Sequence, residues 1–380
     1  MLTVIFAFLI SVLHSTSYCS SLDNMSYSPT ITRIIAAAKS GGPLFIVLFN
    51  GILTHRTVDG IDLTVLPFAD AAFASIDAVL VPVTSDPPCF ENATRIDTHV
   101  HVVPDWYREL APSAAGRETP NWNVQSHLQF MADNHVKRSI VCVSTPQANL
   151  FPGSPELTAA LARVLNEFVA ALVRTYPNRF SFQAITPLPY TDAAIKEVNY
   201  ALDNLGAVGV GVLTNHEGKY PGDASFKPLW QALESRKSDR EIVFVHPTDP
   251  VINIDGRLVP SNPGKFFCNF ILTPSVFNHG ALYDTPDLCL RLFSSAHYLK
   301  APFRSGLGEF YFETARAISS LTASRTIHDF PKLHYRISHG AGAFPCIEDR
   351  FLLGFPDLQA EAREIYATRL VQHGHIPLPV

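Results

Sequence analysis

The stretch Arg95-Ile96-Asp97-Thr98-His99-Val100-His101-Val102-Val103 opens the regular part of this 380-residue chain. It is short and rich in β-branched residues, so it predicts a strand. His99 and His101 are two positions apart, and side chains at i and i+2 of a strand point to the same face. Both imidazoles can therefore enter one site, and neutral imidazole is a common ligand for zinc-like metals. Alone, the pair is a weak metal signature, because isolated histidines most often lie at a protein surface.

Strand-like and helix-like stretches alternate on the carboxyl side of this first strand. The strand-like stretches are short and apolar, and the helix-like stretches are amphipathic. Alternation at this spacing predicts βαβ units and a parallel sheet. The predicted strands are Arg138–Val143, Arg179–Ile185, Ala207–Leu213, Glu241–His246 and Leu333–Ser338. The predicted helices are Val124–Asn134, Pro155–Tyr176, Asp192–Leu205, Phe226–Ser235, Tyr311–Ile327 and Ala343–Phe351.

Two of the later strands also end in a histidine. His246 closes the run Val243-Phe244-Val245, and His339 follows Arg336-Ile337-Ser338. In a (β/α)8 barrel the carboxyl ends of the strands converge on the face where active sites are built. We therefore expect four histidines from three strands to lie together, which core packing alone does not explain. The other eleven of the 15 histidines lack this position, and we interpret them as surface or structural residues.

The composition indicates a protein with a large apolar core and argues against several kinds of binding site. Hydrophobic residues make up 47% of the chain and charged residues 17%, which is enough apolar material for a large core. The net charge of −5 gives no electrostatic case for binding nucleic acid or an anionic membrane surface. None of the six cysteines has CxxC spacing, so a cysteine zinc site is not expected.

The elements Ile96–His101, His246-Pro247 and Ser338-His339-Gly340-Ala341-Gly342-Ala343-Phe344-Pro345 together resemble the amidohydrolase-2 family. This family includes aminocarboxymuconate-semialdehyde decarboxylase. The resemblance is greatest to the fungal 6-methylsalicylate decarboxylases of polyketide secondary metabolism. It covers roughly residues 94–263 and 308–368, and Ser338–Pro345 is its most specific part.

The resemblance implies a fold, a metal site and an activity. The fold is α/β, a (β/α)8 barrel of the TIM type. His99, His101 and His246 match the metal ligands, with zinc or sometimes manganese as the metal. His339 matches the catalytic histidine, and Trp122 lies where a residue of the substrate pocket is expected. The implied reaction is non-oxidative decarboxylation of a small aromatic acid with an ortho hydroxyl, of the 6-methylsalicylate or orsellinate type, by a homodimer.

One departure from the family pattern keeps two alternatives open. The family's last metal-site residue is an aspartate in a Gly-Ser/Thr-Asp-Phe/Tyr-Pro motif, and this sequence contains no such motif. The segment after His339 resembles a helix and a polar tail, too short for two βα units of about 30 residues each. We therefore predict a barrel that lacks its last two strands. The alternatives are an amide or lactone hydrolase of the same superfamily and a catalytically impaired member of the family.

The chain before the barrel divides into a leader and an extension. Residues 1–22 contain the apolar run Leu2–Leu13, which has the length of a signal-peptide core and is short for a membrane span of about 20 residues. No Lys or Arg precedes this run, so a start at Met25 is the alternative. The resemblance favours the cytosol, and the apolar start leaves a secretory route open.

Residues 23–93 form an extension of uncertain fold, and residues 94–380 form the predicted barrel. Within the extension we expect a helix and two strands, namely Thr32–Lys39, Leu44–Leu48 and Ala78–Val83. Residues 264–308 break the strand and helix rhythm of the barrel. A structureless loop of this length is unusual in a compact domain, so it is either a functional lid or an inserted segment, and we favour the inserted segment.

Overall fold

The computed structural model describes residues 57–58, 60–83, 90, 93–114, 117–254, 257–260 and 305–372. All of them belong to one compact unit that begins at Arg56. The predicted leader, the predicted elements Thr32–Lys39 and Leu44–Leu48, and residues 264–304 of the predicted insertion lie outside the described residues. Among the described residues, no helix has the length and apolar character needed to cross a membrane.

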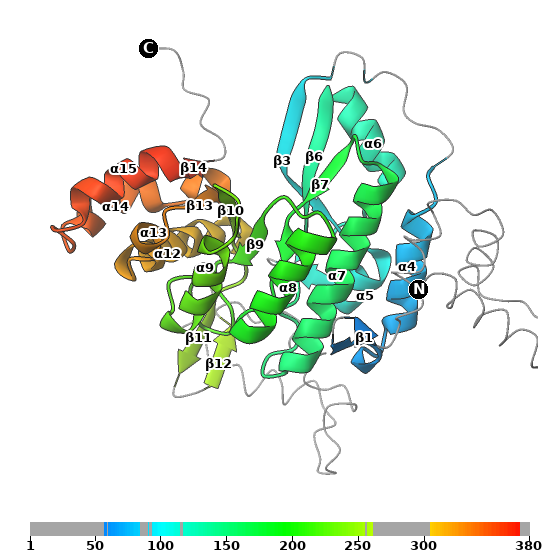
Figure 1. Ribbon diagram of the computed structural model, residues 1–380, viewed down its shortest axis with the longest axis horizontal. Helices are drawn as coiled ribbons and strands as arrows, with labels where there is room; N and C mark the ends of the chain where they lie inside the picture. Colours follow the sequence, from blue (N-terminus) through cyan, green and yellow to red (C-terminus); the bar gives the residue numbers. More distant parts are fainter. Residues whose placement is uncertain are drawn as a thin grey trace, which may run out of the picture. The chain divides into compact units, whose positions relative to one another are not determined.

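Parallel strands form the centre of the fold and follow one another in the order of the chain (Figure 1). One sheet has the order β3-β6-β7 and the other β14-β13-β10-β9-β8. Only Gln183 separates β7 from β8. Its backbone N–H donates to Val141 of β6, while Ala184 donates to Gly209, so the pairing passes from one sheet to the next. The strands are β3 (Arg95–Val102), β6 (Val136–Val143), β7 (Phe180–Phe182), β8 (Ala184–Ile185), β9 (Val210–Leu213), β10 (Glu241–His246), β13 (Leu333–Ile337) and β14 (Leu370–Gln372).

Helices connect these strands, as a (β/α) barrel requires. The longest, α7, has a proline in its first turn, where the missing N–H costs nothing, and it buries most of one side. The main helices are α4 (Ala69–Val79), α5 (Asp105–Leu110), α6 (Val124–Asp133), α7 (Pro155–Thr175), α8 (Thr191–Asn204), α9 (Lys227–Glu234), α12 (Glu309–Ala323), α13 (Thr326–Asp329), α14 (Phe344–Leu352) and α15 (Gln359–Arg369). The α/β barrel predicted from the alternating pattern is therefore confirmed.

The structure also contains short antiparallel hairpins and 3-10 turns. Three antiparallel hairpins pair β1 with β2, β4 with β5, and β11 with β12. They comprise β1 (Thr57–Val58), β2 (Ile61–Asp62), β4 (Ser113–Ala114), β5 (Arg117–Glu118), β11 (Val251–Ile254) and β12 (Arg257–Pro260). The 3-10 turns are η2 (Leu63–Val65), η3 (Ala224–Phe226), η4 (Ser305–Leu307) and η5 (His339–Ala341).

The strands present alternate residues to the helices and to the interior of the barrel. Val243, Val245, Tyr335 and Ile337 belong to the apolar core that also contains residues of α9, α12 and α15. The intervening side chains of β10 and β13 must therefore point to the opposite side. Those side chains are Phe244, His246, Arg336 and, directly after β13, Ser338.

Two local predictions are wrong. Ala78–Val83 was expected to be a strand, whereas Ala69–Val79 is helix α4, which packs against α7. Alanine is the best helix former, and this segment contains five alanines. The stretch Leu370–Gln372 lies in the predicted polar tail, but it forms β14, because Leu370 is buried and the strand pairs in parallel with β13. In the described part of the chain the parallel array ends at β14.

Candidate metal centre

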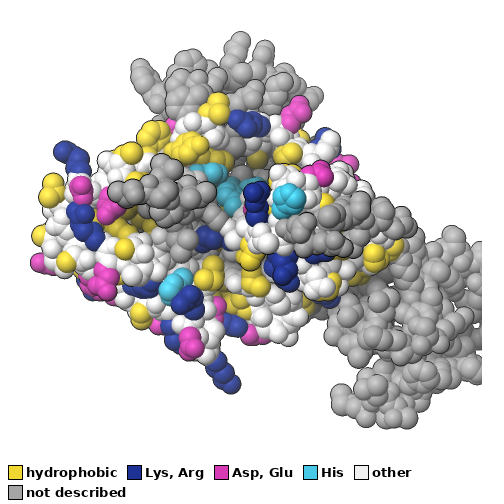
Figure 2. Space-filling model, turned by 90° about the horizontal axis from the view of Figure 1, so that it is seen from above, with side chains coloured by type: hydrophobic (Ala, Val, Ile, Leu, Met, Phe, Trp, Pro, Cys, Tyr) yellow, Lys and Arg dark blue, Asp and Glu magenta, His cyan; other side chains and the backbone are white. Residues whose placement is uncertain are grey.

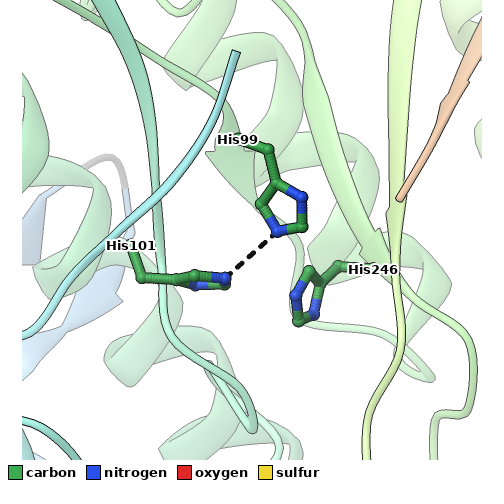
Figure 3. A group of neighbouring side chains, drawn as sticks. All are labelled: His99, His101 and His246. Atoms are coloured by element: carbon green, nitrogen blue, oxygen red, sulfur yellow. Dashed lines mark hydrogen bonds between the residues drawn. The ribbon is translucent and has the colours of Figure 1, made fainter. Parts of the chain in front are cut away.

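Three histidines from two strands meet inside the barrel. His99 and His101 lie on β3, and His246 is the last residue of β10. One nitrogen from each ring lies within 4.8 Å of the other two, so the group could hold a metal ion. The Nε2 atoms of His99 and His101 are 3.2 Å apart, and the His246 ring faces them (Figure 3). The strand-end argument thus correctly placed these three side chains together.

His339 joins this cluster from β13. Its ring centroid lies 5.3 Å from that of His99 and 5.6 Å from that of His246. The residue begins η5 with a positive φ of 52°, in the left-handed region. Gly342 closes the turn with φ +60°, and a Cβ there would lie 2.3 Å from the carbonyl oxygen of Tyr311. The Gly-Ala-Gly sequence therefore allows the turn that holds His339 beside the other three histidines.

Burial keeps the imidazoles of His101, His246 and His339 neutral. Desolvation lowers the pKa of His101 to about 4, with a further contribution from His339. Desolvation, followed by the neighbouring histidines, lowers the pKa of His246 well below its usual value. The pKa of His339 is also lowered by partial desolvation, although the residue is exposed to solvent. At pH 7 the cluster therefore offers lone pairs rather than positive charges.

One nitrogen of the cluster has no partner. The Nδ1 of His246 is buried and makes no hydrogen bond within the described residues. Leaving a buried polar atom unsatisfied costs about 1–3 kcal/mol, so such an atom calls for a ligand. Three neutral imidazoles from rigid strands match the donor set of a zinc-like divalent metal. The residues of this chain therefore fit the metal that the resemblance implies.

Aromatic side chains surround the histidines. Phe244 lies edge-on to His99, with 5.1 Å between the ring centroids. From the first turn of α12, Phe310 approaches His246 at 6.3 Å and Tyr311 approaches His339 at 6.0 Å. Phe310 is buried and Tyr311 is 43% exposed, so the pair runs from the histidines towards solvent. Figure 2 shows histidine side chains gathered around a hollow near the middle of the face seen from above.

Sequence reasoning missed these aromatic residues. The position of Phe244, two residues before His246, is a signal that could have found it, because both must face the interior. For Phe310 and Tyr311 the sequence holds no comparable signal. Their place beside the histidines depends on the backbone contact between Ala343 and Tyr311, where the N–H donates to the carbonyl oxygen over 3.0 Å.

Trp122, the predicted substrate-pocket residue, contacts side chains of α6 and α7. Its indole N–H donates to Nδ1 of His127 over 3.0 Å, and its ring packs against Phe168 of α7. The Nε2 of His127 in turn lies 3.3 Å from the hydroxyl oxygen of Ser139. These contacts place Trp122 between α6 and α7, and none of them involves the four clustered histidines. We therefore give it no role in the site.

Comparison with known proteins gives consistent matches. The model of the amidohydrolase family Amidohydro_2 matches residues 96–370. Decarboxylase yanB of Aspergillus niger is 30% identical over 264 residues, which cover 67% of this chain and 61% of that protein. A 6-methylsalicylic acid decarboxylase of Penicillium expansum is 28% identical, covering 67% of each chain. This chain thus spans less than two thirds of the length of yanB.

A solved structure supports the same fold. The crystal structure of an amidohydrolase II superposes with a TM-score of 0.51 and 25% identity, covering 73% of this chain and 74% of that chain.

Proposed function

Because this chain belongs to the amidohydrolase family, we propose that it is a metal-dependent carboxy-lyase that removes the carboxyl group of a small aromatic acid. The observation that carries the proposal is the convergence of His99, His101 and His246 within 4.8 Å, with His339 beside them. The relatives named above support a decarboxylase, and one of them is a 6-methylsalicylic acid decarboxylase. We propose an acid with an ortho hydroxyl, of the 6-methylsalicylate or orsellinate type, as the substrate.

We propose that His99, His101 and His246 hold the metal through their neutral imidazoles. Zinc is the first candidate and manganese the second. When bound there, such an ion supplies Lewis-acid chemistry for the carboxylate and the ortho hydroxyl of the acid. The three side chains come from two strands of the barrel, so the protein holds them in place before any substrate arrives.

His339 is the residue that we propose to move a proton. Of the four histidines it is the exposed one, so its ring can exchange protons with solvent. In the net reaction a proton adds to the ring carbon that bears the carboxylate, the bond to the carboxyl carbon breaks, and carbon dioxide leaves. A positioned acid or base of this kind contributes about 10²–10⁴-fold to a rate. Among the described residues of the cluster, His339 is therefore our candidate for this step.

The aromatic residues beside the histidines suit an aromatic substrate. Phe310 and Tyr311 present their rings next to His246 and His339. Aromatic rings favour offset or edge-to-face contacts with one another. A substrate ring bound there would have its carboxylate close to the histidines, since the two groups of residues are in contact.

The proposal is tested by incubating the purified, zinc- or manganese-loaded protein with 6-methylsalicylate, orsellinate and an aromatic lactone. Release of carbon dioxide with loss of the carboxylate from the aromatic product supports it. Consumption of the lactone without carbon dioxide would instead identify a hydrolase of the same superfamily. Folded, metal-loaded protein that acts on none of the three compounds would contradict the proposed catalysis.

A further inference from the structure

A buried cation lies inside the barrel on the same strand as His339. Arg336 stands in the middle of β13 and is only 8% exposed. Its strand neighbours Tyr335 and Ile337 belong to the core packed against the helices, so Arg336 points to the interior. Burying an unpaired guanidinium is expensive, so its neighbours must compensate for the charge.

The first neighbour of Arg336 is an aromatic ring on β10. Arg336 and Phe244 are register partners of the parallel pair β10 and β13, and the guanidinium carbon lies 4.2 Å from the centre of the Phe244 ring. This is cation–π geometry, which contributes about 2 kcal/mol or more when the cation is desolvated. The opposite contacts of the Phe244 ring are to histidines, with centroid distances of 5.1 Å to His99 and 5.9 Å to His246.

The charge of a carboxylate on β3 also acts on Arg336. Burial lowers the pKa of Arg336 to about 10, while the carboxylate of Asp97 opposes that shift. Asp97 also accepts a hydrogen bond from the backbone N–H of His99, over 3.0 Å. Arg336 is therefore linked to His99 on β3 and to His246 on β10 through the ring of Phe244.

We infer that Arg336 is a positioning residue that holds β3 and β10 in the arrangement in which His99 and His246 meet. The inference rests on the metal site of the proposed function. It adds to that site Arg336, which lies nearer to the amino ends of the strands than the histidines do. Arg336 acts through Phe244 and Asp97 and touches no substrate.

The flat shape of the guanidinium matters as much as its charge. The Nε and Nη2 atoms are buried and have no hydrogen-bond partner within the described residues. The contact that holds the guanidinium is therefore the face of the Phe244 ring, and the charge of Asp97 favours the cation. Lysine keeps the charge but lacks the planar surface, so Arg336→Lys retains only part of the effect. Arg336→Met fills a similar volume and removes both the charge and the plane.

Arg163 offers a matched control elsewhere in the chain. It is fully buried on α7, pairs with Glu197 at 2.8 Å, and stacks its guanidinium over Tyr200 at 3.6 Å. It thus has the same chemistry as Arg336, a buried guanidinium with a carboxylate and an aromatic ring, but its partners lie on α8. Arg163→Met should lower the melting temperature without changing the histidine cluster.

The experiment compares wild type, Arg336→Met, Arg336→Lys and Arg163→Met by zinc affinity, measured by competition with a chelator. Partners beneath the ligands of a metal site typically contribute 10–100-fold to affinity. We expect about this loss for Arg336→Met, a smaller loss for Arg336→Lys, and no more than about a twofold change for Arg163→Met. Wild-type zinc affinity in Arg336→Met, or an equal loss in Arg163→Met, would overturn the inference. If Arg336→Met does not fold, Arg336→Lys decides the question by the same comparison.

A second readout separates this inference from the proposed function. The ring resonances of His99 and His246 are recorded by nuclear magnetic resonance in the metal-free proteins. Displaced resonances in Arg336→Met and unchanged ones in Arg163→Met support the positioning role even if wild type binds no zinc, a result that would contradict only the proposed function. Unchanged resonances in Arg336→Met would overturn the positioning role whether or not zinc binds.

Discussion

Two kinds of buried histidine occur in this barrel, and they differ in how their nitrogens are satisfied. His127 receives a hydrogen bond from Trp122 on one nitrogen and meets Ser139 with the other. His216 likewise accepts from the backbone N–H of Leu213 and contacts the Asn149 side chain. The clustered histidines instead face one another, and Nδ1 of His246 has no partner within the described residues.

The difference separates structural histidines from a candidate metal site. A histidine whose two nitrogens are both used within the protein has no lone pair left for a ligand. In the cluster, one nitrogen of each of His99, His101 and His246 lies within 4.8 Å of the other two, so one ion could be bound by all three. Burial alone does not distinguish the two kinds, because His127, His216 and His246 are all buried.

The largest effect should come from removing a proposed ligand. His246→Ala deletes one of the three imidazoles and leaves two half-buried ones. We expect zinc affinity to fall by more than the 10–100-fold that is typical of residues behind the ligands, and decarboxylation to disappear. Equilibrium dialysis with zinc measures the change. His216→Ala is the control, and equal loss of zinc in both variants would erase the distinction between the two kinds of histidine.

His339 should show a large effect on rate with little effect on metal binding. His339→Asn removes the proposed proton-moving group while the three ligands remain. We expect turnover to fall by about 10²–10⁴-fold and the zinc content to stay at the wild-type level. Steady-state kinetics together with metal analysis test this. Loss of zinc along with turnover would make His339 a ligand instead.

His127 should matter for stability and not for metal. His127→Ala leaves the partly buried Trp122 N–H and the buried Ser139 hydroxyl without their partner. The free energy of unfolding should fall by about 1–3 kcal/mol, since unsatisfied buried groups cost this much. Urea unfolding measures the loss. A parallel drop in zinc affinity would show that the two regions are coupled.

The smallest predicted effect concerns how the stability of the fold depends on pH in acid. Burial lowers the pKa of His127 to about 4, so the folded state binds fewer protons than the unfolded state, whose histidine has its ordinary pKa near 6.5. Stability therefore rises with pH in this window and is lost as pH falls from about 6.5 towards 4. We expect a shallower loss in His127→Phe, measured by unfolding at several pH values in metal-free protein. An identical slope in both proteins would remove His127 from this effect.

The sequence allowed the histidine cluster to be predicted because each member lies in the carboxyl half of a predicted strand or directly after one. His99, His246 and His339 share this position, whereas His127 lies in a helix and His216 in a loop after β9. The direction of Arg336 also follows from alternation along β13. Its contact with Phe244 could not be predicted, because it depends on the register between β10 and β13.

What the sequence did not predict also depends on contacts between elements that are far apart in the chain. The apolar pattern of Ala78–Val83 predicted a strand. The segment instead begins at the end of helix α4, which is stabilised by packing against α7. The role of Trp122 was inferred from the resemblance alone and stays a prediction, and its hydrogen bond to His127 could not be foreseen from the sequence. The strand β14 was missed because Leu370–Gln372 is too short for a pattern to be recognised.

The central claim is that His99, His101 and His246 bind one metal ion. X-ray absorption at the zinc edge of the zinc-loaded protein tests this most directly. The account predicts one zinc ion per chain with three imidazole nitrogens at about 2.0–2.1 Å, and two in His246→Ala. A folded protein without stoichiometric zinc or manganese, or a zinc shell unchanged by His246→Ala, would contradict it.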